Sequence, residues 1–247
     1  CNQMDANEFY NSLFASLETS LSHVPGREKL LGTLFQGTTV TQVECQVDTK
    51  HVSRRQETFY SVSVDVKNAG NLGRALSNFI AGENMTGDNQ YVCSFCNKKV
   101  DAVRRTLFQT LPPVLVVHLK RFEFQMSTMS QIKLHNRCEF PMVLDMEPYM
   151  ASPQKGAEEQ STSEEPSGPA AVPSTDFSPY KYRLSGIVVH SGSANGGHYF
   201  SYHRNPSDPN KWLELNDTVV SDFDPRLIPE NCFGSKEEPG APPTTRS

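Results

Sequence analysis

The chain has 247 residues, of which 36% are hydrophobic and 21% are charged, and its formal net charge is -5. This length is sufficient for one large or two small domains whose hydrophobic core needs no disulfides. The net charge argues against non-specific binding of nucleic acid, and no apolar run approaches the length that spans a membrane.

The first residues, Cys1-Asn2-Gln3-Met4-Asp5, do not form a signal peptide, and because they do not begin with Met we expect the chain to be part of a longer protein. Six cysteines, two of them in a Cys-x-x-Cys, indicate a reducing compartment and metal binding rather than disulfides. The expected location is cytosolic or nuclear.

A helix is predicted from Asp5 to about His23. Its apolar residues recur every four positions and predict a face turned toward the core: Phe9, Leu13, Leu17 and Leu21, widened by Ala6, Tyr10 and Phe14. Asp5 and Glu8 resemble a capping box and suit the positive end of the helix dipole. The polar group of Gln3, Asp5 and Glu8 has two interpretations, an ordinary helix start or a surface for a cationic peptide.

The middle of the chain is predicted to be rich in strands. Strands are expected at Val40–Cys45, Thr58–Val66 and Val100–Thr110, and a short helix at Asn71–Ile80. Residues 114–124 read VLVVHLKRFEF, which favours a central strand buried on both faces. His118 within it is interpreted as a hydrogen-bonded core residue.

A metal site is predicted around Cys93 and Cys96, because two thiolates at this spacing are typical of half a tetrahedral zinc site. The other half is irregular. A second Cys-x-x-Cys is expected about fifty residues upstream, and there Cys45 is followed at that spacing by Asp48, with His51 nearby. Zinc can be held by Cys45, Cys93 and Cys96 together with either Asp48 or His51. It can also be held by Cys93 and Cys96 together with both of those residues. The alternative is a site without metal that is held by packing.

Two segments are predicted to be disordered. Residues 151–178 are crowded with Pro, Ser, Glu and Gly and cannot bury enough surface to offset their ordering entropy. They are interpreted as an insertion between two strands. The end of the chain, from Phe233 to Ser247, is expected to be loose as well.

Residues 186–220 carry the strongest candidate for catalysis. His198 begins an apolar strand directly after Gly196 and Gly197, and Asn216 and Asp217 follow the next alternating strand. An imidazole titrates near neutral pH and can accept and return a proton, and an amide or carboxylate can fix its tautomer. This pattern is half of a catalytic triad, although an ordinary hairpin also explains a histidine after two glycines.

Four motifs in order resemble the ubiquitin-specific proteases, the papain-like deubiquitinases. QMDANEFYNSL resembles the Gln-box, LPPVLVVHLKRFEF the palm strand, and YRLSGIVVHSGSANGGHYFSY with KWLELNDTVVS the His-box. CNKKVDAVRRTL and CEFPMVLDMEPYM are most similar to the large fat-facets-type branch. The similarity runs from about Gln3 to Gly234, apart from the insertion.

The resemblance implies an α+β, papain-like cysteine protease fold, with the palm and fingers portion present and most of the thumb missing. The implied parts are a helical thumb remnant with the Gln-box at 1–35, fingers at 36–110, and a palm at 111–150 and 179–234. The insertion is then 151–178 and the disordered tail 235–247.

The resemblance also implies residue roles. His198 would be the general base, Asn216 would orient it, and Asp217 would be a second polar group beside it. The tail of ubiquitin would meet the other matching positions: Gln3, Asp5, Glu8, Gly196, Gly197 and Tyr199. One structural zinc is expected at Cys45, His51, Cys93 and Cys96, and no organic cofactor. Partners would be ubiquitin and ubiquitinated proteins, not nucleic acid or membranes.

The sequence departs from the family at the nucleophile. The family's Cys-box, roughly Gly-Asn-Thr-Cys followed by an aromatic residue, has no match here, and Cys1 falls ahead of the Gln-box instead. We therefore expect a thiol-dependent ubiquitin hydrolase whose nucleophile lies elsewhere, so that this chain by itself cleaves nothing. The alternatives are a non-catalytic ubiquitin-binding module and a zinc-ribbon interaction protein.

Overall fold

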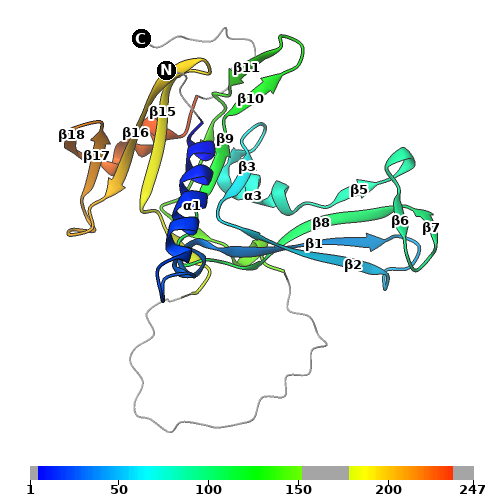
Figure 1. The fold of residues 1–247 in the computed structure, drawn as a ribbon. Coiled ribbons are helices and arrows are strands. Elements are labelled where there is room, and N and C mark those ends of the chain that lie inside the picture. Colours follow the sequence, from blue (N-terminus) through cyan, green and yellow to red (C-terminus); the bar gives the residue numbers. More distant parts are fainter. Residues whose placement is uncertain (1–4, 152–177, 236–247) are drawn as a thin grey trace.

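The structure, a computed structural model, describes residues 5–151 and 178–235. A central body carries two four-stranded sheets: one projects to one side, and the other lies on the opposite side beyond helix α1 (Ala6–Ser22) (Figure 1). Gln3 and nearly all of the predicted insertion and tail lie outside the described residues. No helix among the described residues is long and apolar enough to cross a membrane.

Helix α1 confirms the first predicted helix. Asp5 is its N-cap, and the Asp5 carboxylate accepts hydrogen bonds from the backbone N–H groups of Asn7 and Glu8, which have no partner within the helix. The cap fixes where the helix begins and therefore where Asp5 lies.

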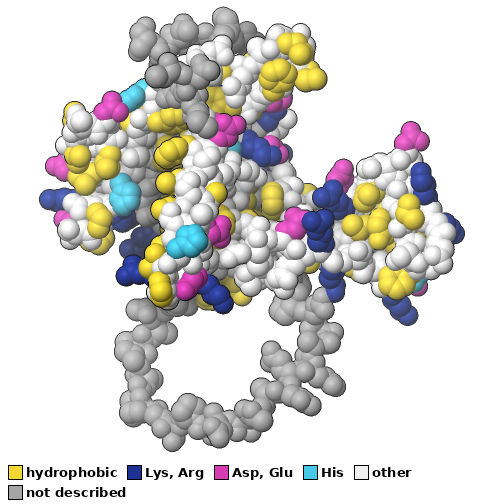
Figure 2. Space-filling view, viewed as in Figure 1, with side chains coloured by type: hydrophobic (Ala, Val, Ile, Leu, Met, Phe, Trp, Pro, Cys, Tyr) yellow, Lys and Arg dark blue, Asp and Glu magenta, His cyan; other side chains and the backbone are white. Residues whose placement is uncertain are grey.

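The predicted core face of α1 is confirmed only in part. Phe14 is buried and packs against the rings of Tyr10, Phe35 and Tyr60. Of the residues at four-residue spacing, Phe9 is 60%, Leu13 41% and Leu17 38% exposed, whereas Leu21 is half-buried. Hydrophobic side chains are visible along α1 in Figure 2. Two apolar stripes lie side by side on this helix, and periodicity does not say which of them packs inward.

The projecting part is an antiparallel sheet in the order β2-β1-β8-β5. Its strands are β1 (Gly37–Cys45), β2 (Val52–Phe59), β5 (Glu83–Met85) and β8 (Ala102–Thr110). Beyond β5, strands β6 (Tyr91–Cys93) and β7 (Lys98–Val100) form a hairpin at the far end (Figure 1). This hairpin contains the Cys-x-x-Cys.

The central body is built on β3 (Val62–Asp65), which pairs in parallel with β9 (Val117–Lys120), and on α3 (Leu72–Ile80), which packs with them. Residues 62–80 fall inside the range predicted for the fingers but belong to this core. Its buried side chains are Val62, Val64, Ala69, Leu72, Ala75, Leu76, Phe108, Met146 and Tyr149.

Two predicted strands are each interrupted. Residues 58–66 belong to β2 and β3, which lie in different sheets, with a bend at Tyr60–Ser61. The run 114–124 is divided between β9 and β10 (Phe122–Gln125), and β9 is only half-buried. Arg121 lies between the two, and its guanidinium donates to the carbonyl oxygens of Leu134, Asn136 and Phe233. Apolar content alone does not reveal such a break.

The second sheet holds the predicted His-box in the antiparallel order β15-β16-β17-β18. The strands are β15 (Gly186–Ser193), β16 (Gly196–Arg204), β17 (Trp212–Asn216) and β18 (Val219–Phe223). The sheet has its own core of Tyr202, Trp212, Ile228 and Phe233, and short helix α4 (Ile228–Cys232) contributes to it.

The remaining elements are short. They are α2 (Leu30–Phe35), β4 (Gly70–Asn71), β11 (Ser130–Lys133), β12 (Cys138–Glu139), β13 (Val143–Asp145), β14 (Lys181–Arg183) and single helical turns at Gly87–Asn89, Glu147–Tyr149 and Pro225–Leu227. β10 and β11 form a hairpin, β12 pairs with β4, and β13 pairs with β14.

Candidate functional site

The structure brings His198 and Asn216 into contact. His198 is the third residue of β16, and its Nε2 lies 2.6 Å from Oδ1 of Asn216 at the end of β17. An amide oxygen can only accept, so Nε2 carries a proton in this contact. The side chain of His198 is 43% exposed. A neutral imidazole in this tautomer can take a proton at Nδ1 from an incoming group.

The amide of Asn216 is itself oriented. Its Nδ2 donates to Oε1 of Glu214 at 3.4 Å, which turns Oδ1 toward the histidine. Asp217 is the next residue and has a left-handed backbone with φ 52°. Its carboxylate is 3.9 Å from Nε2 of His198 and 77% exposed. The structure therefore assigns the close contact to Asn216 and places Asp217 as a second, longer-range partner.

A second group of predicted residues meets at the start of α1. The hydroxyl of Tyr199 accepts a hydrogen bond from the backbone N–H of Ala6 at 3.3 Å, next to Asp5. Burial raises the pKa of Tyr199, so this hydroxyl stays protonated at neutral pH. Glu8 is exposed one turn further along the helix. The contact joins β16, directly after His198, to the N-terminus of α1.

Gly196 and Gly197 precede His198, and their surroundings differ. A Cβ at Gly197 would collide with the carbonyl oxygen of Ser191 and the imidazole of His190, whereas one at Gly196 meets no described atom within 4 Å. Gly197 is therefore required by the packing of the hairpin. Gly196 is not.

This difference gives a stability prediction. Gly197→Ala should lower the free energy of unfolding by about 1–3 kcal/mol, the usual cost of overpacking. Gly196→Ala should change it by less than about 0.5 kcal/mol. Urea unfolding of the two variants measures both, and equal stability of the two would contradict the packing described for Gly197.

Among the described residues, no cysteine thiol hydrogen-bonds to His198. Cys138 is buried and Cys232 is half-buried, and burial raises the pKa of both thiols, that of Cys232 to about 12. The three other described cysteines lie together at the end of the projecting sheet. None of the described thiols is placed to react beside this histidine.

The candidate metal centre brings together Cys45, His51, Cys93 and Cys96, whose donor atoms all lie within 4.8 Å of one another. Nδ1 of His51 is 3.3 Å from the Cys96 sulfur and 3.9 Å from the Cys93 sulfur, and the Cys45 and Cys96 sulfurs are 3.8 Å apart. The Cys96 backbone N–H donates toward the Cys93 sulfur and lowers its pKa. Three thiols and one imidazole form a donor set that fits tetrahedral zinc.

The sequence left Asp48 and His51 as alternatives, and the structure separates their positions. His51 directs Nδ1 toward the thiols and Nε2 toward the Asp48 carboxylate, 3.7 Å away. Its ring also stacks on Phe95 at 4.8 Å. Asp48 thus lies behind the histidine, where a carboxylate orients a metal-binding imidazole.

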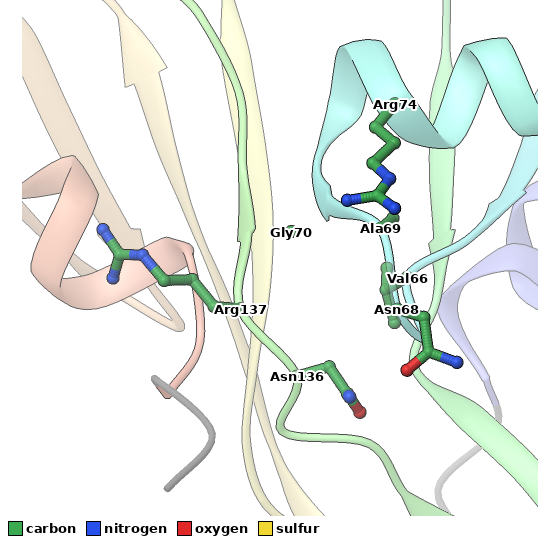
Figure 3. A pocket seen from close by; sticks show the side chains of 7 residues that line it. All are labelled: Val66, Asn68, Ala69, Gly70, Arg74, Asn136 and Arg137. Carbon is green, nitrogen blue, oxygen red and sulfur yellow. The ribbon is translucent and has the colours of Figure 1, made fainter.

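A hollow of about 240 Å³ lies elsewhere, between the loop before α3 and the segment before β12 (Figure 3). It is lined by Val66, Asn68, Ala69, Gly70, Arg74, Asn136 and Arg137. Arg74 reaches into the hollow from α3, whereas the side chain of Arg137 extends away from it, over the ring of Phe233. None of the predicted site residues lines this hollow.

Two residues that contact the hairpin of His198 had no signal in the sequence. His190 packs against Gly197 and Tyr199, and Lys133 donates to backbone oxygens of β15. Both roles depend on contacts between residues distant in the chain. An amino-acid pattern does not report such contacts.

Comparisons with known proteins agree with these features. A family model described as ubiquitin carboxyl-terminal hydrolase matches residues 1–238. Ubiquitin carboxyl-terminal hydrolase 9X of Mus musculus is 37% identical over 252 residues, covering 95% of this chain and 10% of that protein. The probable ubiquitin carboxyl-terminal hydrolase FAF of Drosophila melanogaster is 36% identical over 240 residues, covering 95% of this chain and 8% of that protein.

Solved structures are similar as well. The SAGA Ubp8/Sgf11/Sus1/Sgf73 DUB module bound to ubiquitin aldehyde contains a chain that superposes with a TM-score of 0.75 at 27% identity, over 94% of this chain and 48% of that one. A mutant form of the same module, bound to monoubiquitin, contains a chain with a TM-score of 0.74 and 26% sequence identity. The match covers 94% of this chain and 47% of that one. The chain thus spans about a tenth of its curated relatives and about half of the solved chains.

Proposed function

The chain belongs to the ubiquitin carboxyl-terminal hydrolase family, and on that basis we propose that it supplies the histidine and asparagine of a thiol-dependent deubiquitinase. The reaction is hydrolysis of the peptide or isopeptide bond at the C-terminal glycine of ubiquitin. The observation that carries the proposal is the 2.6 Å contact between His198 Nε2 and Asn216 Oδ1, which fixes the tautomer that a thiol protease needs.

The proposed mechanism uses Nδ1 of His198 twice. Nδ1 first takes the proton of a cysteine thiol, and the thiolate attacks the carbonyl carbon of the ubiquitin glycine. The imidazolium then returns that proton to the leaving lysine amine as the C–N bond breaks, which leaves a thioester. Nδ1 next takes a proton from water as its oxygen attacks the thioester carbonyl, and the imidazolium returns this proton to the sulfur as the C–S bond breaks. Throughout, Asn216 holds Nε2–H and keeps the ring in place.

We propose that the sulfur comes from polypeptide outside this chain, so that this chain alone is inactive. Two observations support this. The described cysteines do not contact His198, and α1 presents the exposed apolar side chains of Phe9, Leu13 and Leu17 (Figure 2). An apolar stripe of this kind on a surface helix marks a contact with further protein.

We propose ubiquitin as the partner, because the similar solved structures contain ubiquitin aldehyde or monoubiquitin. The carboxylates of Asp5 and Glu8 would face the arginines of the ubiquitin tail, as would Gln3 ahead of them. Gly196, where an added Cβ would meet no described atom within 4 Å, would leave room for the two terminal glycines. Tyr199 would hold the start of β16, where the ubiquitin tail is proposed to bind, against the N-terminus of α1.

We further propose that the cluster of Cys45, His51, Cys93 and Cys96 holds one structural zinc. Bound zinc would tie the β6–β7 hairpin to β1, because it links ligands on both. The hairpin would then be a fixed end of the projecting sheet, which is expected to grip the body of ubiquitin. Asp48 would hold the tautomer of His51.

The experiment that tests the function uses the full-length protein and a fluorogenic amide of the ubiquitin C-terminus. Release of the fluorophore, with ubiquitin ending in an intact glycine, is the expected result. Binding of ubiquitin without any release would overturn the enzymatic proposal in favour of a non-catalytic ubiquitin-binding module. A protein that neither binds nor cleaves ubiquitin would contradict both.

The two neighbours of His198 should contribute unequally. Asn216→Ala should lower kcat about 10–100-fold, because the ring loses the acceptor that fixes it, whereas Asp217→Ala should lower kcat less than about 5-fold. The measured quantity is kcat for the fluorogenic amide. If Asp217→Ala had the larger effect, the assignment of Asn216 as the orienting residue would be wrong.

A further inference from the structure

Lys133 bridges two hairpins beside the proposed catalytic histidine. It ends β11, and its Nζ donates to the carbonyl oxygens of His190 at 2.8 Å and Gly192 at 3.0 Å. These two residues flank Ser191, which is the cross-strand partner of His198. The lysine therefore holds the stretch of β15 that lies directly opposite His198.

The geometry of the sheet explains why these oxygens are free to accept. β15 is the edge of the sheet, with β16 on one side. Carbonyl groups of alternate residues on a strand point the same way, and those on the outer side of an edge strand lack a strand partner. The ammonium of Lys133 meets two such oxygens, at His190 and Gly192, and takes the place of a neighbouring strand.

The segment that Lys133 holds leads into the turn between β15 and β16. Gly192 has a left-handed backbone with φ 109°, and small residues follow it up to Gly197, so the turn has little side-chain packing of its own. The ring of His190 packs against Phe122 at 5.1 Å and Tyr199 at 4.6 Å. Phe122 lies on β10, the partner strand of β11. The β10–β11 hairpin thus contacts the His198 hairpin through both a ring and an ammonium.

Lys133 is held by these carbonyl dipoles rather than by an acid. No described carboxylate forms an ion pair with it, and burial, together with the nearby Arg121, lowers its pKa. Other lysines near this region pair on the surface instead, such as Lys67 with Glu123 of β10 at 3.5 Å. A half-buried ammonium that donates to two backbone oxygens fixes the position of that backbone more firmly than an exposed ion pair between two flexible side chains does.

We propose that Lys133 is a positioning residue: it clamps the carbonyls of His190 and Gly192 and so fixes the hairpin that presents His198 to the substrate. This inference rests on the proposed deubiquitinase function for its effect on turnover. The clamp itself is a property of the fold, and it can be measured without turnover.

The kinetic test compares Lys133→Met, Lys133→Arg and the control Lys67→Met in the full-length protein, with a fluorogenic amide of the ubiquitin C-terminus as substrate. Lys133→Met should lower kcat about 10-fold or more with KM within about 2-fold, because small misplacements of a catalytic group slow the chemistry. Lys133→Arg, which keeps the charge and the donors, should recover most of kcat. Lys67→Met should leave both constants within about 2-fold.

A second readout uses the chain of this structure, labelled with nitrogen-15 at histidine. In the unmodified chain the ring nitrogens of His198 should show one tautomer, protonated at Nε2. Lys133→Met should give averaged shifts that report exchange between tautomers, and Lys133→Arg should restore the single form. If Lys133→Met does not fold, Lys133→Gln replaces it, because its amide is uncharged and one atom shorter than the lysine, so it cannot hold both carbonyl oxygens as the ammonium does.

Three results would overturn the proposal. One is an unchanged kcat in Lys133→Met, and another is an unchanged His198 tautomer in that variant. The third is a raised KM at constant kcat, which would mean that the lysine contacts substrate and does not position the histidine. If the unmodified full-length protein hydrolyses no ubiquitin derivative, the proposed function fails, and the nitrogen shifts still decide whether the clamp exists.

Discussion

Replacing His198 by alanine in the full-length protein is expected to lower kcat for a ubiquitin C-terminal amide about 10⁴-fold, while the affinity for ubiquitin changes little. The imidazole supplies both the base that forms the thiolate and the acid that protonates the leaving amine, so its loss removes both steps. Binding persists because ubiquitin is expected to contact mainly α1, the glycines and the projecting sheet.

The control for this variant is His203→Ala. His203 lies on the same strand, is exposed, and bonds through Nδ1 to the carbonyl oxygen of Arg204 at 2.6 Å. It should keep kcat within about 2-fold, as is usual for a surface substitution. Turnover retained by His198→Ala would remove His198 from the mechanism.

The second large effect is expected at the candidate metal centre. The purified chain should contain about one zinc, and Cys93→Ser should reduce the zinc content to near zero, because three remaining ligands hold a structural zinc poorly. Metal binding to such small sites supplies much of their folding free energy. The β6–β7 hairpin should therefore become sensitive to proteolysis in the variant, while the core around Phe108 and Leu76 stays folded.

Zinc content is measured by atomic emission on protein purified without added metal. Cys232→Ser is the control, because Cys232 packs against the separate core of Tyr202 and Trp212 and should not affect the metal. If the unmodified chain contains no metal and takes up no added zinc, the zinc proposal is wrong. The four side chains would then be held together by packing alone.

Much of the fold was accessible from the sequence. The predicted α+β, papain-like fold of the ubiquitin-specific proteases is confirmed by the family match and by the similar solved structures. The motifs around His198 and Cys93 identified the family because they are local patterns of residue types at fixed spacing. Strands joined by short turns lie next to each other, so the side-chain contact of His198 with Asn216 at the end of β17 could be expected from the order of the strands.

The other features of the fold and the site depend on contacts between residues that are far apart in the sequence or on local backbone conformation, so the sequence did not predict them. α1 has two adjacent apolar stripes, and the tertiary neighbours Phe35 and Tyr60 select the one that contains Phe14. Asn216 and Asp217 are adjacent in sequence, and the left-handed backbone at Asp217 leaves the close contact to Asn216. Lys133 looked like any surface lysine, because its two acceptors lie almost sixty residues away.

The most direct test of the account is the reaction of the full-length protein with ubiquitin that carries an electrophile in place of its last glycine. We expect one covalent adduct on one cysteine, seen as a single mass increase, that forms much more slowly in His198→Ala. Failure to form the adduct, or an adduct that forms equally fast without His198, would contradict the claim that this histidine, oriented by Asn216, activates a sulfur.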